Sequence, residues 1–407
     1  MEFIHKYQQS REKTMKDFIF SNTTKVYFGK DQLQHLGGEV KQFGQKVLLV
    51  YGGGSIKKIG LYDKVMAELK KADLTVYELP GVEPNPHHTT VNKGAALCKA
   101  EGIEVILAVG GGSTIDASKA MAATAKYDGD DCWDLVTGKG TSNGHLPIVT
   151  VLTLAATGSE MDIGGVISNV ELNEKQPLFG PNLRPNVSFL NPVNTYSVSA
   201  YQTASGSVDI MSHIFDVAYF SNFELMDMLL LAQEAVLSTV VKYAPVALAK
   251  PNDYEARANL MWASSWALNG FLYDGNMFAQ PAICHNIEHE LSAFYNITHG
   301  HGLAIVTPRW LRYILSEKTA PRIKRFGVKI MGIDENLSLM EDAAAAIDAL
   351  EKFFFETLGL PSRLSNLGID DKNFEIMAKK ACGPEGQLNG MTLLKPEDIV
   401  EIFKMCL

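Results

Sequence analysis

Half of the ten histidines lie in the third quarter of the chain, where their spacing with one aspartate could build a metal site. Asp209 and His213 are four residues apart, and so are His285 and His289, so each pair would share one face of a helix. His299 follows ten residues after the second pair. A carboxylate with imidazoles is a suitable ligand set for Zn²⁺ or Fe²⁺. One histidine alone would more often be a core residue, but two such pairs with a third histidine favour a metal centre.

Two copies of the sequence GGGS also point to chemistry. They occupy residues 52–55 and 110–113, and each follows an apolar run and precedes a helical stretch. Glycines let the backbone approach a pyrophosphate, and the next helix offers free N–H groups and a favourable dipole. A third turn of small polar residues, 157–160, follows another apolar run. Neither GGGS matches GxGxxG, and one copy is equally typical of a tight strand–helix turn, but three such turns favour a dinucleotide site at the carboxyl ends of strands.

The first of these turns favours NADP(H) over NAD(H). An NAD site commonly places a carboxylate beside the adenosine ribose, where it would repel a 2′-phosphate. Here the apolar run ends in glycine and serine, and Lys57 and Lys58 follow.

Two kinds of domain are needed to position these residues. Up to about residue 196, apolar runs alternate with helical stretches, which predicts βαβ units and a parallel sheet. We expect strands at 46–51, 74–79, 104–109, 147–154 and 187–190, and helices at 55–72, 89–101 and 113–126. Beyond it we expect only helices, at 207–219, 223–249, 253–270, 280–294, 300–316 and 338–358. The predicted fold is α/β plus all-α: a Rossmann-like domain, 1–196, with 1–14 as a short extension, and an all-helical metal-binding domain, 197–407.

Composition excludes several classes of protein. The 407 residues are 46% hydrophobic and 20% charged, which is enough for two cores and excludes a disordered chain. The net charge of −9 argues against nucleic-acid binding. The N-terminus lacks the apolar core of a signal peptide, and polar residues interrupt the apolar stretch 228–249, so we predict a buried helix and no membrane span. Five scattered cysteines without a CxxC pair predict the thiols of a cytoplasmic enzyme.

In this order, the motifs resemble the iron-dependent (group III) alcohol dehydrogenase family, above all its NADPH-dependent butanol dehydrogenase and aldehyde reductase branch. The likeness runs from Phe18 to the C-terminus. It is carried by YFGK (27–30), YGGGSIKKIG (51–60), GVEPNP (81–86), AVGGGSTIDASK (108–119), TLAATGSE (153–160), VDIMSH (208–213), MWASSWALNG (261–270), the histidines at 285, 289 and 299, and LGLPSRLSNLGI (358–369). The resemblance implies a dehydroquinate synthase-like fold and a homodimer.

The resemblance also implies a role for each matching residue. Four of them would bind one divalent metal, Fe or Zn: Asp209, His213, His285 and His299. His289 would lie at the nicotinamide end of the coenzyme and take part in proton transfer. Three would lie near the adenosine (Gly53, Gly54, Ser55), four in the pyrophosphate turn (Gly111, Gly112, Ser113, Asp116), and four at other coenzyme contacts (Thr153, Thr157, Lys175, Leu190).

Three residues depart from the family pattern. Asp162 stands where relatives tend to have Asn, Asn191 replaces an Asp, and Asp216 replaces a Glu. Asp162 would lie beside the nicotinamide, where we expect it to add negative charge to the substrate pocket.

The reaction implied is hydride transfer between NADP(H) and a primary alcohol or aldehyde, with aldehyde reduction as the direction in vivo and the metal as Lewis acid. The proton would pass through bound water, His289 or the ribose hydroxyl. The cleft between the domains would be the pocket, with an apolar lining that includes Trp133, Met161, Phe271 and Phe278. The alternatives are a glycerol-dehydrogenase-like or other polyol dehydrogenase of the same fold, a metal-dependent hydrolase, and a non-catalytic metal or nucleotide binder.

Overall fold

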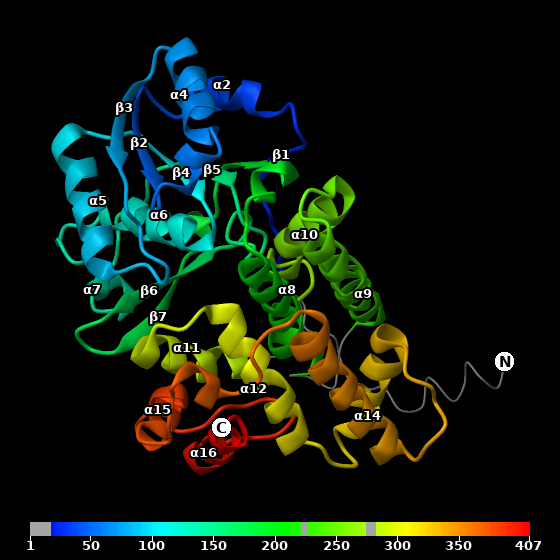
Figure 1. Ribbon diagram of the computed structural model, residues 1–407. Helices are drawn as coiled ribbons and strands as arrows, with labels where there is room; N and C mark the ends of the chain where they lie inside the picture. Colours follow the sequence, from blue (N-terminus) through cyan, green and yellow to red (C-terminus); the bar gives the residue numbers. More distant parts are fainter. Residues whose placement is uncertain (1–17, 221–225, 274–281) are drawn as a thin grey trace.

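A six-stranded parallel sheet forms the first half of the protein, and helices form the second (Figure 1). The computed structural model describes residues 18–220, 226–273 and 282–407. The strand order is β1-β8-β5-β4-β2-β3. The strands are β1 (Lys25–Phe28), β2 (Lys46–Tyr51), β3 (Thr75–Leu79), β4 (Val105–Gly110), β5 (Ile148–Leu152) and β8 (Val187–Leu190). The predicted division into an α/β part and a helical part is confirmed.

Side chains that alternate along the central strands explain why both faces of this sheet are covered. Val47 and Leu49 of β2 pack under α2 (Leu36–Lys41) and α4 (Leu61–Lys71), while Leu48 and Val50 face α5 (His88–Glu101) and α6 (Gly112–Thr124). All four side chains are buried, which matches an apolar run without polar interruption. The remaining helices of this half are α3 (Ser55–Lys58) and α7 (Cys132–Val136).

An antiparallel hairpin, β6 (Gly164–Asn169) and β7 (Glu174–Phe179), was not predicted. It leaves the main sheet and lies against α11 (Ile283–Tyr295) of the helical half, as Figure 1 shows. The hairpin therefore carries side chains of the first half toward the helices of the second.

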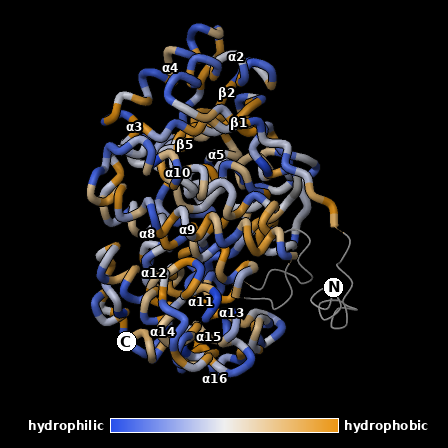
Figure 2. The backbone as a smooth tube through the Cα atoms, turned by 90° about the vertical axis from the view of Figure 1, so that its right-hand side faces the viewer, coloured by the Kyte–Doolittle hydropathy of each residue, from blue (hydrophilic) through white to orange (hydrophobic). Residues whose placement is uncertain are grey.

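The helical half begins at α8 and runs to the C-terminus. Its members are α8 (Ala200–Ile214), α9 (Asp227–Ala249), α10 (Tyr254–Ala267), α11 (Ile283–Tyr295), α12 (His299–Tyr313), α13 (Ala320–Phe326), α14 (Leu339–Lys352), α15 (Phe374–Ala381) and α16 (Pro396–Met405). Turns of π-helix extend three of them, at Phe215–Tyr219, Gly327–Met331 and Phe353–Thr357. Short 3₁₀ turns lie at Leu33–His35, Pro181–Leu183, Pro192–Thr195, Leu364–Leu367 and Gly383–Glu385. Figure 2 shows α8, α9 and α10 between the sheet and the helices α11 to α16, which lie in the lower part of the view.

Helix α9 covers the whole stretch 228–249, for which we predicted a buried helix, but only 33% of its most apolar window is buried. By length and composition alone it could cross a membrane, but it packs against α8 and α10, and Leu229, Leu237 and Val240 are among its buried residues. The α14 start is also as expected, because the Ser338 hydroxyl caps it by accepting from the Glu341 N–H at 3.4 Å.

All five cysteines are buried and carry free thiols. Cys98 and Cys132 lie in the core of the α/β half, whereas Cys284, Cys382 and Cys406 lie in the helical core. Burial raises the pKa of the Cys98 thiol to about 12 and that of Cys382 to about 11.

Candidate metal centre and coenzyme site

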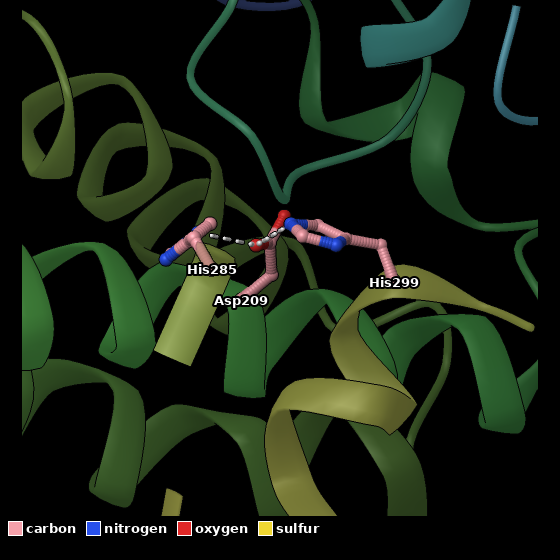
Figure 3. Close-up of side chains that lie close together, drawn as sticks. All are labelled: Asp209, His285 and His299. Carbon is pink, nitrogen blue, oxygen red and sulfur yellow. Dashed lines mark ion pairs between the residues drawn. The ribbon is translucent and has the colours of Figure 1, made fainter. Parts of the chain in front are cut away.

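Asp209, His285 and His299 come together from three helices, α8, α11 and the first residue of α12 (Figure 3). Asp209 Oδ1 is 3.9 Å from His285 Nε2 and 3.6 Å from His299 Nε2. Metal–ligand bonds of about 2.1 Å in a tetrahedral shell separate neighbouring donor atoms by about 3.4 Å. The three donor atoms therefore have nearly the spacing that one divalent ion requires.

His213 adds a fourth donor to this group. Its Nε2 is 3.8 Å from the same Asp209 Oδ1, and its ring stacks on that of His285 with centroids 4.7 Å apart. The helix period explains the contact, because His213 is one turn beyond Asp209 on α8. We refer to Asp209, His213, His285 and His299, the four predicted metal ligands, as the ligand cluster.

The chemistry of the ligand cluster fits a metal. Asp209 Oδ1 and His285 Nε2 are buried and have no hydrogen-bond partner, which is a costly state for two polar atoms that face each other. Burial raises the pKa of Asp209 to about 7. Burial also holds the pKa values of His213 and His299 well below normal, so both imidazoles are neutral near pH 7 and keep lone pairs for coordination. A divalent ion would coordinate these two unpaired atoms and offset the cost of their desolvation.

Two buried carboxylates hold the ligand histidines from behind, and sequence reasoning missed the role of both. Both Asp216 oxygens are 3.0 Å from His285 Nδ1, and one also accepts the His285 backbone N–H at 2.8 Å. Glu288 accepts from Nδ1 of His299. Each contact occupies Nδ1 and leaves Nε2 of the same histidine free to bind a metal, as is usual for metal-bound histidine. The available signals were spacing: Asp216 is two turns beyond Asp209, and Glu288 is one turn beyond His285.

His289 is half-buried and lies beside the cluster without joining its Asp209-centred donor set. Its ring centroid is 5.5 Å from that of His299 and 6.3 Å from that of His285. Burial and the nearby Lys175 charge hold the pKa of His289 well below normal. A neutral imidazole at this position can accept or donate a proton near the reacting atoms.

The second GGGS turn packs against the turn at 153–157. The Thr153 N–H donates to Gly110 O at 3.0 Å, and a Cβ on Gly112 would lie 2.4 Å from Thr157 Oγ1. Glycine is therefore required for these two turns to touch. Ser113 lies in the first turn of α6, which begins at Gly112 and directs its free N–H groups beyond the carboxyl end of β4.

Asp116 has a different environment from the one expected of a pyrophosphate contact. Its two carboxylate oxygens accept from Ser159 Oγ at 2.6 Å and from the Val166 N–H at 2.9 Å. The Asp116 side chain on α6 thus binds the turn at 157–160 and the strand β6.

The first GGGS turn, Gly53–Ser55, is open to solvent at the end of β2. Gly54 has a φ of +99°, and a Cβ on Gly53 would meet no atom within 4 Å. The nearby carboxylate of Glu78 is already engaged, because its oxygens accept from Tyr51 at 2.8 Å and from Tyr62 at 2.9 Å.

A hollow of about 90 Å³ lies beside the ends of β1 and β8. Leu190, predicted to pack on the nucleotide, lines it together with Asn194, and Lys30 and Lys64 contribute its positive charge. Asn191, one of the departures, serves as the cap of the turn that follows β8, where its Oδ1 accepts the Val193 N–H at 3.1 Å.

Lys175 reaches the ligand cluster from β7. Its Nζ is 3.5 Å from His299 Nδ1 and 3.7 Å from Glu288 Oε2, and the residue is 5% exposed. The unpredicted hairpin therefore positions the one predicted coenzyme residue that comes closest to the metal ligands.

The expectation for Asp162 is wrong. Its carboxylate forms a buried ion pair with Lys119, whose Nζ also donates to Gly164 O at 2.6 Å. The negative charge is thus compensated inside the α/β half and is not presented to a substrate.

The expected apolar lining is also different in part. Trp133 packs in the core of the α/β half, 6.0 Å from the His88 ring, and Phe271 lies in an aromatic row with Phe20 and Trp266. Met161 is buried at the junction of the halves, where its carbonyl accepts from Asn22. Phe278 lies outside the described residues.

His301, which had no predicted role, is fully buried as a core residue. Its Nδ1 is 3.0 Å from Tyr201 Oη, and its Nε2 is 2.8 Å from Pro361 O.

Family models match both halves of the chain. Residues 23–192 match the model of the iron-containing alcohol dehydrogenases, and residues 203–407 match the C-terminal model of the Fe-containing alcohol dehydrogenase family.

Individual relatives cover almost the whole chain. NADH-dependent butanol dehydrogenase B of Clostridium acetobutylicum is 48% identical over 96% of this chain and 99% of its own length. The NADPH-dependent aldehyde reductase YqhD of Escherichia coli is 35% identical over 93% of this chain and 95% of its own length. The crystal structure of NADH-dependent butanol dehydrogenase A from Thermotoga maritima superposes with a TM-score of 0.90 at 38% identity, covering 96% of this chain and 99% of that one.

Proposed function

The chain belongs to the iron-containing alcohol dehydrogenase family, and from this membership we propose that it transfers hydride between NADP(H) and a primary alcohol or aldehyde. We propose aldehyde reduction as the direction in the cell. The relatives are named butanol dehydrogenases and an aldehyde reductase, which favours this substrate class over the polyols.

One observation carries the proposal. A single carboxylate oxygen, Asp209 Oδ1, faces the Nε2 atoms of three histidines at 3.6–3.9 Å, beside a lysine delivered from the nucleotide-binding half. The ligand cluster would hold Fe²⁺ or Zn²⁺. A bound metal of this kind supplies Lewis-acid polarisation of a carbonyl or hydroxyl oxygen, and a nicotinamide coenzyme supplies or accepts the hydride.

The protein's own groups supply placement and proton handling. Asp216 and Glu288 fix the ligand imidazoles, and Lys175 brings positive charge to the place where the coenzyme would meet them. His289 lies next to His299 with its pKa held well below normal, so its neutral ring can relay a proton to the product oxygen by accepting one from solvent at one nitrogen while it donates one from the other.

The coenzyme is proposed to be NADP(H). The open Gly53–Ser55 turn itself carries no carboxylate, and Lys57 and Lys58 follow it. The Glu78 carboxylate nearby accepts from the hydroxyls of Tyr51 and Tyr62. A 2′-phosphate bound at the turn would therefore meet no carboxylate of the turn and would lie near two lysines. Several relatives are named NADH-dependent, so the ratio of the two coenzymes is a direct test.

Three further assignments complete the proposal. The α/β half (1–196) is the coenzyme domain and the helical half (197–407) is the metal domain. A homodimer is supported by the sheet edge at β1 and by exposed apolar side chains in the segment that precedes this strand in the sequence, Phe18, Ile19 and Phe20. Five free buried thiols support a cytoplasmic location.

The test is metal analysis of the purified protein combined with steady-state kinetics on an aldehyde series with NADPH and NADH. We expect one Fe or Zn per chain and a higher kcat/KM with NADPH. His285→Ala should lose both the metal and the activity, because the buried Asp209 then lacks a partner ligand. Aldehyde reduction by a metal-free His285→Ala protein at the wild-type rate would refute the proposal.

A further inference from the structure

Glu288 is a buried carboxylate at the junction of the two halves. It lies on α11 between two histidines of the site and is fully buried. One of its oxygens, Oε2, accepts from His299 Nδ1 and is 3.7 Å from Lys175 Nζ, while Oε1 accepts from the Ser292 hydroxyl at 2.5 Å. A metal ligand and a coenzyme-side lysine therefore share one carboxylate oxygen.

The neighbouring backbone is built around this side chain. A Cβ added at Gly302 would lie 2.6 Å from Glu288 Cγ and 2.8 Å from Oε1. Glycine thus lets α12 approach α11 closely, one turn after His299, and the carboxylate fills the space.

The contacts give Glu288 two consequences at once. Donation of the Nδ1 proton to Oε2 fixes the His299 tautomer and turns its Nε2 toward Asp209, as carboxylate–histidine pairs do behind metals. Attraction between the Lys175 ammonium and the same carboxylate holds the β6–β7 hairpin on the metal helices.

We propose that Glu288 is a positioning residue that sets the metal ligand His299 and the coenzyme-side Lys175 together, so that the metal and coenzyme sites depend on one carboxylate. This inference rests on the proposed function, in that it takes the ligand cluster to hold a divalent metal.

The test uses Co²⁺ as the probe, added to metal-free protein and followed by the visible absorption of the bound ion. Glu288→Gln keeps the volume that Gly302 requires but removes the charge. We expect Co²⁺ to bind about 10- to 100-fold more weakly than in wild type, with a changed absorption band, because loss of such a partner typically has this effect.

Glu290→Gln is the matched control. Glu290 is also a buried glutamate on α11, 3% exposed, but the charges that act on it are those of Lys380 and Glu174 and not those of the ligand cluster. Its replacement should leave Co²⁺ affinity within about twofold, which would show that a neutral glutamine on this helix is not itself the cause.

The coenzyme side is read by NADPH fluorescence titration. Glu288→Gln and Lys175→Met should each weaken NADPH binding, and the double variant should be no weaker than Lys175→Met alone, because the two residues act as a unit. Additive effects, or wild-type Co²⁺ affinity and absorption in Glu288→Gln, would overturn the inference. Failure of wild-type protein to bind metal or NADPH would instead overturn the proposed function.

Discussion

Asn85 and Asn296 meet side chain to side chain across the junction of the two halves, and both have left-handed backbone conformations. Asn85 Nδ2 donates to Asn296 Oδ1 at 2.9 Å, with φ values of +54° and +50° for the two residues. Asparagine is among the few residues that adopt this conformation readily. The contact joins the loop after β3 to the segment that ends α11 and leads into His299.

Removal of this contact should make the backbone segment that leads into His299 more mobile without unfolding the protein. Asn296→Gly keeps the left-handed backbone accessible but removes the acceptor, which is a loss of about 1 kcal/mol or roughly fivefold in an equilibrium. We expect the KM for the coenzyme to rise by that factor and the amides of residues 297–299 to exchange faster. Asn173→Gly, another left-handed asparagine (φ +49°), is the control and should change neither. Unchanged exchange at 297–299 would show that the contact restrains nothing.

A carboxylate placed in the first glycine turn should reverse the coenzyme preference. The space around the Gly53 Cβ position is empty, so Gly53→Asp fits without strain. We expect kcat/KM with NADPH to fall about 10- to 100-fold, from repulsion of the 2′-phosphate, while kcat/KM with NADH changes by less than about threefold. Gly53→Asn has the same shape without the charge and should retain the wild-type ratio. Equal losses for both coenzymes would contradict the assignment of this turn to the 2′ position.

The Lys119–Asp162 ion pair should matter for stability and not for substrate choice. Asp162→Asn leaves the fully buried Lys119 ammonium without its carboxylate partner, and loss of a charged hydrogen bond of this kind costs about 2 kcal/mol. We expect a lower midpoint of thermal unfolding and an unchanged ratio of kcat/KM between neutral and anionic aldehydes. A shift of that ratio toward anionic aldehydes would mean that the Asp162 charge does reach the substrate.

Glu160 should make stability depend on pH. Burial raises its pKa from 4.5 to about 7; one oxygen accepts from Ser265, and the other has no partner. A raised folded-state pKa means that the stabilising effect of the protonated form is complete below pH 4.5 and is lost as the pH rises through about 7. The loss amounts to about 3 kcal/mol.

The thermal stability of Glu160→Gln should therefore increase relative to that of wild type as the pH rises. The comparison is the midpoint of thermal unfolding of metal-loaded wild type and variant at several pH values between 4.5 and 8. Two parallel curves would show that the carboxyl group does not titrate in this window.

The parts of the fold with strong apolar periodicity could be predicted from the sequence, whereas strand β1 and the β6–β7 hairpin could not. The strand expected at 46–51 is β2 with the same bounds, because its buried residues face helices on both sides. The edge strand β3 was also expected, at 74–79, whereas the other edge strand, β1, was missed because it has only four residues. The hairpin strand β7 was missed because it includes Pro177 and pairs only with β6.

In the candidate site, too, the local sequence pattern predicted some features and not others. Helical spacing brought Asp209 and His213 to one face, as expected, and the glycine turns lie at the carboxyl ends of β2 and β4. Contacts between distant segments could not be predicted, since nothing in the local pattern links Lys119 to Asp162 or Lys175 to Glu288. Tertiary packing, which places a charge either in solvent or against its partner, decides those cases.

The five buried thiols can report local unfolding of the protein through their reaction with a thiol reagent. A thiol reagent reaches a buried cysteine only when the surrounding structure opens, so labelling rates measure the free energy of that opening. Cys98 and Cys132 would respond to opening of the sheet half, Cys382 and Cys406 to the distal helices, and Cys284 to the helix that carries His285. Mass spectrometry of the labelled peptides could then compare how metal and coenzyme stiffen each region, in the unmodified natural sequence.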